Sequence, residues 1–527
     1  MPNTAAAHTT TIEFMTVDAM NRHPGRTNRP PQTQQQPQPL NTLSGDLGRD
    51  MSLLRARLGH SEDIVLRDFR YGAQDSFAAA LIYVAGMVNQ EVLDNAVLKP
   101  LLFDEAANHP YDMPTLAATM VASVSVIVRD SVDAMVDDIL SGCTLLLAEG
   151  CHQGLSIGAR KWPQRAVQEP STETVVRGPR QGFVETLQSN LVMIRRIVKN
   201  PNLRIEMMTV GRQTNTSVAI LSIEGVVMPG LVEAVKGRIA SMDVDMVLES
   251  GNLQAAMSDA PWSIFSTVGS SERPDSVAGM IMEGRVAVAV DGSPFVLTAP
   301  CLFMESFQNP EDYYIKAYFA TFMRIIRLFS YVIAMMAPAA YVALTTFHQE
   351  MLPTPLLFSM AAGHQDIPFP SLVEALLMMV LFDVLKEAGV RLPKPIGSAV
   401  SIVGALVLGQ SAVDAGIISP FMVIVVAITA IASFTVPSQM NTTLLLRYFL
   451  LLCAGFLGGF GIVMALLFLL LHLSSLYSYG VPYMSPFAPV SLEGIKDSAV
   501  RMPQALLRLR PQWIGKRNPM RRKGGWT

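Results

Sequence analysis

Four ionised side chains interrupt an apolar stretch and are the residues of this chain best placed for specific chemistry. They lie in SLVEALLMMVLFDVLKEAG, residues 371–389, and are Glu374, Asp383, Lys386 and Glu387. An ionised group in a bilayer costs several kcal/mol unless it is paired or reached by water. Two interpretations therefore stay open: an interfacial ion-pair network, and a role in ion passage.

The spacing of these charges restricts what they can do together. Glu374 and Asp383 are nine residues apart, which on a helix of about 100° per residue puts them on roughly opposite faces. They are therefore not expected to face one pore axis together. The other three form a local cluster near the helix end: Asp383, Lys386 and Glu387. We expect this cluster to lie against Arg391 or Lys394.

A second candidate site is the segment 396–409, where small residues recur along an apolar run. They are Gly397, Ser398, Ser401, Gly404 and Ala405. Such a stripe permits close helix packing, and it equally suits a narrow pore wall with a valine constriction. The pore interpretation requires an oligomer. Its pore or gate candidates are Ser398, Val400, Ser401, Val403, Gly404 and Val407.

Enzymatic and metal-binding chemistry find little support. The chain has no Walker lysine loop, HExxH, CxxC pair or GxGxxG after a strand. Its one GxSxG match, Gly154–Gly158 around Ser156, follows a turn instead of the strand that a nucleophile elbow needs. Three histidines of the apolar half lack metal-ligand spacing: His348, His364 and His472. We expect no enzyme, no cofactor, no metal and no nucleic-acid partner.

The elements that must position the charges form an apolar block over residues 319–473. Five apolar segments are expected helices: residues 328–344, 371–389, 396–409, 420–436 and 444–473. About 20 apolar residues already cross a bilayer, so the block predicts a multi-pass α-helical membrane domain. Gly455 and Gly459 form a GxxxG, interpreted as helix packing.

Charge placement predicts the orientation of this block. Arg324 and Arg327 precede the first expected span, and the loop 345–370 contains no lysine or arginine. The soluble part and the basic tail, residues 474–527, are then cytoplasmic. Both ends on one side require an even number of crossings, so one of the five segments, best 371–389, should not cross fully. That places Arg391 and Lys394 on the far side, against the positive-inside tendency, and the conflict stays open.

Before the block, short apolar strands alternate with amphipathic helices, which predicts an α/β cytoplasmic domain. We expect a disordered arm (residues 1–48), a first α/β half (50–165), a connecting loop and helix (166–200) and a second half (201–310). Aligning Gly142 with Gly284 places Gly150 over Gly292. The α/β domain therefore predicts an internal duplication.

Several long stretches resemble the A subunit of the GerA family of spore germinant receptors. They include EPSTETVVRGPRQGFVETL, DGSPFVLTAP followed by FQNPEDYY, YVALTTFHQEMLPT and SYGVPYMSPFAP. The resemblance runs from about residue 60 to 500. It departs from the family at Met379 and Leu381, where an acid and a threonine are usual, which weakens an ion path along residues 371–389.

The resemblance implies a multi-pass protein of the spore inner membrane with B and C receptor subunits as partners. It also implies a homo-oligomer that forms a germinant-gated ion channel, with 396–409 as the preferred pore segment. The alternative is a non-conducting membrane scaffold or signalling subunit of the receptor. A solute carrier fits less well, because transporters often repeat within the membrane and this repeat precedes it.

Overall fold

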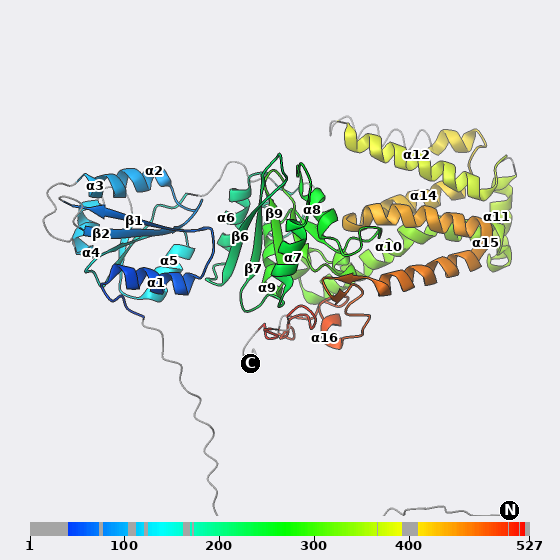
Figure 1. The fold of residues 1–527 in the computed structure, drawn as a ribbon. Helices are drawn as coiled ribbons and strands as arrows, with labels where there is room; N and C mark the ends of the chain where they lie inside the picture. The colour runs from blue at the N-terminus through cyan, green and yellow to red at the C-terminus, as the bar shows by residue number, and fades with distance from the viewer. Residues whose placement is uncertain are drawn as a thin grey trace, which may run out of the picture. The chain divides into compact units, whose positions relative to one another are not determined.

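A computed structural model describes residues 41–72, 77–103, 112–120, 125–161, 169–170, 173–365, 367–392, 409–503, 505–515 and 517–521 (Figure 1). Residues 42–527 form one compact unit. The first helix, α1 (Leu47–Leu58), is capped by the Asp46 side chain, which accepts a hydrogen bond from the Arg49 N–H. Among the described residues, regular structure therefore begins at Leu47, within the last two positions of the range expected for the arm.

The first half of the soluble part holds a five-stranded antiparallel sheet. Its strands are β1 (Ile64–Tyr71), β2 (Phe77–Val84), β3 (Val126–Arg129), β4 (Thr144–Ala148) and β5 (Gly154–Ile157), in the order β1-β2-β4-β5-β3. Besides α1 it has α2 (Gln90–Leu93), which continues through a π-turn, Asp94–Leu98, into α3 (Lys99–Leu102), then α4 (Met113–Met120) and α5 (Val132–Leu140).

The second half repeats this topology. Its strands are β6 (Leu203–Val210), β7 (Thr216–Ile223), β8 (Gly269–Ser271), β9 (Val286–Val290) and β10 (Val296–Ala299), in the order β6-β7-β9-β10-β8. Its helices are α6 (Leu187–Ile197), α7 (Leu231–Ala240), α8 (Ser250–Met257) and α9 (Pro274–Glu283). The shared strand order is what an internal duplication predicts. Gly142 and Gly284, both left-handed, end corresponding helices, α5 and α9.

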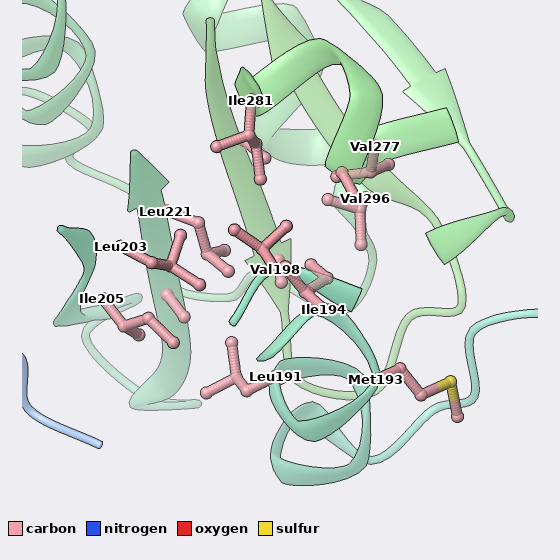
Figure 2. Close-up of a cluster of buried hydrophobic side chains, with 14 of the residues drawn as sticks. Leu191, Met193, Ile194, Val198, Leu203, Ile205, Leu221, Val277, Ile281 and Val296 are labelled. Atoms are coloured by element: carbon pink, nitrogen blue, oxygen red, sulfur yellow. The ribbon is translucent and has the colours of Figure 1, made fainter. Parts of the chain in front are cut away.

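Both faces of the second sheet are covered by helices. Figure 2 shows one core, in which Leu191 and Ile194 of α6 meet Leu203 and Leu221 of the sheet, with Ile281 of α9 nearby. At the start of β6 the buried side chains of Leu203 and Ile205 alternate with the partly exposed Arg204 and Glu206, as the two-residue period of a strand dictates. Residues of α7 and α8 fill the core on the opposite face: Leu231, Val235, Ile239 and Leu253.

A buried ion pair joins the two halves. Arg195, in α6, donates from Nε to Asp63 Oδ2 at 2.9 Å and from Nη2 to Oδ1 at 2.7 Å. Ser61 Oγ donates to the same carboxylate at 2.6 Å. The Arg195 residue is 0% exposed, so this contact is part of the core between the halves.

The C-terminal half is built of apolar helices: α10 (Ala317–Thr346), α11 (Thr354–His364), α12 (Ser371–Arg391), α14 (Pro420–Ser433) and α15 (Met440–Ser475). Two helical stretches among the described residues are long and apolar enough to cross a membrane, Ala317–Thr346 and Pro437–Ser475. Arg324 and Arg327, expected before the first span, lie inside α10, and their side chains turn to buried Asp312. One sequence expectation was wrong here, because the expected loop 345–370 contains α11.

The expected single helix at 444–473 was also wrong, because α15 is a hairpin of two arms (Figure 1, orange). Gly458 has φ 61° and ψ −144°, which is not helical. Thr442 Oγ1 donates to the Ile264 carbonyl at 2.9 Å, and His472 Nε2 lies 2.9 Å from Ser263 Oγ. A straight helix of 36 residues would hold its ends about 54 Å apart, so the two arms must fold back on each other.

These contacts define two ends of the helical block. The near end holds residues 263–264 and both open ends of α15. The far end holds the Gly458 bend, against which Phe347 packs after α10. The part of the expected tail that the structure describes folds back onto the second half of the soluble part. Ile514 is fully buried beside Leu302.

Candidate functional site

A salt bridge links α12 to the first arm of α15. Nη2 of Arg447 lies 2.9 and 2.8 Å from the two carboxylate oxygens of Asp383, and the Tyr448 hydroxyl donates to Oδ2 at 2.6 Å. The Arg447 side chain is 3% exposed. Within the cluster expected to lie against Arg391 or Lys394, Asp383 thus pairs with Arg447 instead. The partner is the one charge of the last apolar segment, which is distant in sequence.

The expected acidic cluster at the end of α12 divides between two faces. Glu387 is exposed and pairs with Arg391, one turn along the same helix, at 2.6 Å. Lys386 is half-buried. Asp383 bonds to α15 whereas Glu387 bonds within its own helix, so the cluster is not one site.

Glu374 lies in a separate polar cluster near the far end. It is 1% exposed, accepts a hydrogen bond from the Ser419 backbone N–H, and lies 3.2 Å from His364 Nε2. The other ring nitrogen, His364 Nδ1, lies 3.1 Å from the Met360 carbonyl, which can only accept. This geometry makes Nδ1 the donor of that hydrogen bond. The Ser419 hydroxyl is 3.2 Å from Tyr341 Oη.

Glu374 and Asp383 thus contact different neighbours, α11 with α14 in one case and α15 in the other. The helix spacing explains this. Both carboxylates are engaged by other helices. The role in ion passage stays a prediction, and the ion-pair network also stays a prediction.

The pore candidates fall outside the described residues, which have a gap at 393–408. They are Ser398, Val400, Ser401, Val403, Gly404 and Val407. Lys394 lies in the same gap. The pore interpretation of this segment therefore stays a prediction from sequence.

A third charged cluster ties α10 to the soluble part. Asp312, whose side chain is 0% exposed, accepts from Arg324 Nε at 2.8 Å and from Arg327 Nη1 at 2.9 Å. Arg324 Nη1 also donates to the Ser498 carbonyl at 3.0 Å. Burial raises the pKa of Tyr313, whose hydroxyl donates to Asp497 at 3.1 Å. Sequence reasoning missed this junction, although its acid lies in the FQNPEDYY stretch.

A cavity of about 490 Å³ opens beside this junction, between α9 and the C-terminal residues. Arg285 lies at its wall and forms ion pairs with Glu283 and Glu305. Burial raises the pKa of Glu283, which Arg521 also contacts. The charges on this wall neutralise one another, so they form a structural network.

The structure places the GxSxG serine and the histidines as follows. Ser156 is 3% exposed and sits in β5, paired with Leu145 and Ile127 on both sides. A nucleophile elbow instead places its serine on a sharp turn. Within these residues no group of three potential metal ligands comes together. The other two histidines of the helical half are held by hydrogen bonds far from each other in sequence: His348 Nε2 accepts from Gly459 N at 3.1 Å, and His472 contacts Ser263.

Comparison with known proteins identifies the family. The model described as "Bacillus/Clostridium GerA spore germination protein" matches residues 52–513. The chain is 43% identical to spore germination protein KA of Bacillus subtilis (strain 168) over 91% of this chain and 88% of that protein. It is 38% identical to YfkQ of the same strain, named an uncharacterized membrane protein, over 89% of this chain and 91% of that one.

A solved structure also matches in part. It is the crystal structure of the N-terminal domain of the A subunit of the Bacillus megaterium spore germinant receptor GerK3, with 33% identity and a TM-score of 0.40. The match covers 50% of this chain and 97% of that domain. The resemblance seen in the sequence is confirmed by the family model and the relatives, and the chain belongs to the GerA family of spore germination proteins.

Proposed function

We propose that this chain is the A subunit of a germinant receptor and forms, as a homo-oligomer in the spore inner membrane, a germinant-gated ion channel. The observation that carries the proposal is family membership over residues 52–513, which includes the whole helical block. B and C receptor subunits are the partners that the family implies. The names of the relatives, a germination protein and a membrane protein, support the setting.

The path of the chain through the helical block supports a multi-pass arrangement. Helix α10 runs from the Asp312 junction at the near end to Phe347 at the far end. Helix α12 begins at the far end, where Leu372 packs on Gly455, and reaches Arg447 toward the near end. Helix α14 begins beside Glu374 and leads to Gln439, which bonds Ser306 at the near end.

On the basis of this path we propose an even number of crossings in which α12 counts as a full passage, in place of the partial crossing expected for residues 371–389. Helices α10, α12, α14 and the two arms of α15 give five passages between the ends. Because α12 ends at the near end and α14 begins at the far end, the chain between them must return once more. The segment 396–409, predicted from the sequence as an apolar helix and almost wholly outside the described residues, is our proposal for that sixth passage. Because six is an even number, both ends of the block then lie on the cytoplasmic side. Arg391, at the end of α12, lies on that side too, which agrees with the positive-inside tendency.

The non-conducting scaffold is the second candidate. Its support is that Glu374 and Asp383 are engaged by neighbouring helices, which leaves neither acid to line a water-filled path. The segment 396–409 is then the remaining pore candidate. Its valines separate the two functions: under the channel proposal their size limits ion flux, and under the scaffold it does not.

The experiment measures potassium leak from spores, or from proteoliposomes holding the reconstituted receptor, with Val403→Ala or Val407→Ala. The channel proposal expects raised leak without germinant and a ring-like oligomer in membranes. Val463→Ala, on the exposed face of α15, is the matched control and should leave leak unchanged. A protein that stays monomeric with its partners present, and whose valine variants do not leak, contradicts the channel.

A further inference from the structure

Trp262 is almost completely exposed, with 98% of its surface free. It lies in the loop 260–264 between α8 and β8, beside the exposed residues Pro261 and Ile264. A large aromatic side chain that stays exposed to water does not gain the favourable free energy of burying its ring. The exposure therefore indicates that another molecule covers Trp262.

The loop that presents Trp262 is firmly held. On one side Ser263 Oγ contacts His472 at 2.9 Å, and on the other the Ile264 carbonyl accepts from Thr442 at 2.9 Å. The next residue, Phe265, is 1% exposed and packs edge-on against Phe303, with ring centroids 6.0 Å apart. The position of Trp262 is therefore fixed relative to both open ends of the α15 hairpin.

The α15 hairpin also indicates what covers Trp262. Its outer surface is apolar and exposed from the first turns beyond these contacts: Leu445, Phe449, Phe468 and Leu471. In the proposed membrane arrangement, acyl chains cover this surface, so the loop 260–264 lies where hydrocarbon gives way to water. An indole prefers that boundary, because its ring is apolar and its N–H finds partners among headgroups.

We propose that Trp262 inserts into the headgroup region of the bilayer and anchors the second α/β half to the membrane surface. The partner is the lipid itself. The inference rests on the proposed membrane arrangement and adds a contact made by the soluble part. This anchor would fix how deeply the near end of the helical block lies in the bilayer, through the bonds of the loop to His472 and Thr442.

The test uses the full chain in phosphatidylcholine–phosphatidylglycerol nanodiscs, with Trp162, Trp513 and Trp526 changed to Phe so that Trp262 is the sole indole. Fluorescence is measured with lipids brominated at shallow or deep acyl positions. We expect at least twofold stronger quenching by shallow than by deep bromine, with weak quenching by acrylamide. A red-shifted emission open to acrylamide and untouched by bromolipid would overturn the anchor. So would a concentration-dependent blue shift without bromolipid quenching, which would indicate a protein partner.

Tryptophans introduced at two other positions distinguish failure of the Trp262 anchor from failure of the membrane arrangement. In the Trp262→Phe background, Met464→Trp lies in mid-arm on α15, where the side chain is 49% exposed, and should be quenched most by deep bromine. Ile127→Trp, on β3 of the first half and 50% exposed, should be quenched by neither lipid. Quenching at 464 without quenching at 262 rejects the anchor alone, whereas no quenching at 464 rejects the membrane arrangement.

Discussion

Gly461 approaches Cys453 across the bend of α15 so closely that a Cβ on the glycine would lie 2.2 Å from the Cys453 carbonyl oxygen. In a continuous helix, residues eight apart are separated by about 12 Å along the axis. The contact therefore exists only because the chain reverses at Gly458. The reversal makes two antiparallel arms out of one apolar run, and it decides how many times the chain passes between the ends of the block.

Replacing Gly458 by alanine should strongly destabilise the helical block. Its φ of 61° and ψ of −144° belong to a region that only glycine occupies easily, and a Cβ would lie 2.7 Å from the Phe347 ring. We expect a loss of about 3 kcal/mol or more, because strain of about 1–3 kcal/mol adds to the steric overlap. Thermal unfolding of the detergent-purified chain measures it.

Gly480→Ala is the matched control, since Gly480 has φ 78° with nothing within 4 Å of its Cβ position. It should lose only about 1–2 kcal/mol. Adding Phe347→Ala to Gly458→Ala should recover part of the loss. Equal losses at the two glycines would contradict the tight bend.

The pair of Asp383 and Arg447 should show strong coupling. Removing either charge leaves the other uncompensated in an apolar setting, at a cost of about 3–5 kcal/mol. Asp383→Asn and Arg447→Gln should each destabilise the chain by about 3 kcal/mol, since Asp383 keeps 18% exposure. The double variant should lose much less than the sum. A double-mutant cycle by thermal unfolding measures the coupling.

Glu387 and Arg391 give the control on the same helix. Both side chains are more than half exposed, and pairs of this kind contribute about 0.3–0.5 kcal/mol. Additive effects at Asp383 and Arg447, no larger than those at the control pair, would show that the α12–α15 contact does not hold the block together.

Local patterns predicted many elements, and tertiary contacts explain what they missed. Apolar runs located α12 and α14, and paired turn glycines, Gly142 and Gly284, indicated the duplication. The Gly458 reversal was hidden because LGGFG is apolar and compatible with a helix, although its three glycines were a usable signal. The ion pairs of Asp383 and Asp312 join residues 64 and 12 or more positions apart, which no periodicity encodes.

The contact between the halves should depend on Arg195. Arg195→Met leaves Asp63 buried without its cation, so we expect a loss of about 3 kcal/mol or more. Limited proteolysis between the halves should become faster. Arg57→Gln is the control, because its partner Asp133 is 61% exposed, and it should change neither property. Unchanged proteolysis of Arg195→Met would mean that the ion pair does not hold the halves together.

Tyr479 should make stability depend on alkaline pH. Burial raises its pKa to about 12, and its hydroxyl donates to the Met257 carbonyl at 2.9 Å. In the unfolded chain a tyrosine loses its proton near pH 10. The contribution of the buried Tyr479 hydroxyl to the free energy of unfolding is therefore complete below about pH 10 and is lost as the pH rises toward 12.

The measurement is the melting temperature of the full chain and of Tyr479→Phe between pH 8 and 11.5. The difference in melting temperature between the natural chain and Tyr479→Phe should decrease above pH 10. Tyr477→Phe, at a 53% exposed position, should show no such pH dependence. A constant difference across the range would contradict the buried, neutral hydroxyl.

The measurement that tests the hairpin arrangement most directly is sided labelling of single cysteines in sealed vesicles. The four native cysteines are changed to serine, and cysteines are introduced at Gln349, beyond α10, and at Tyr477, beyond α15. The account predicts that a membrane-impermeant maleimide labels the two positions from opposite sides, with Tyr477 on the side of the soluble part. Labelling of both positions from the same side would contradict it.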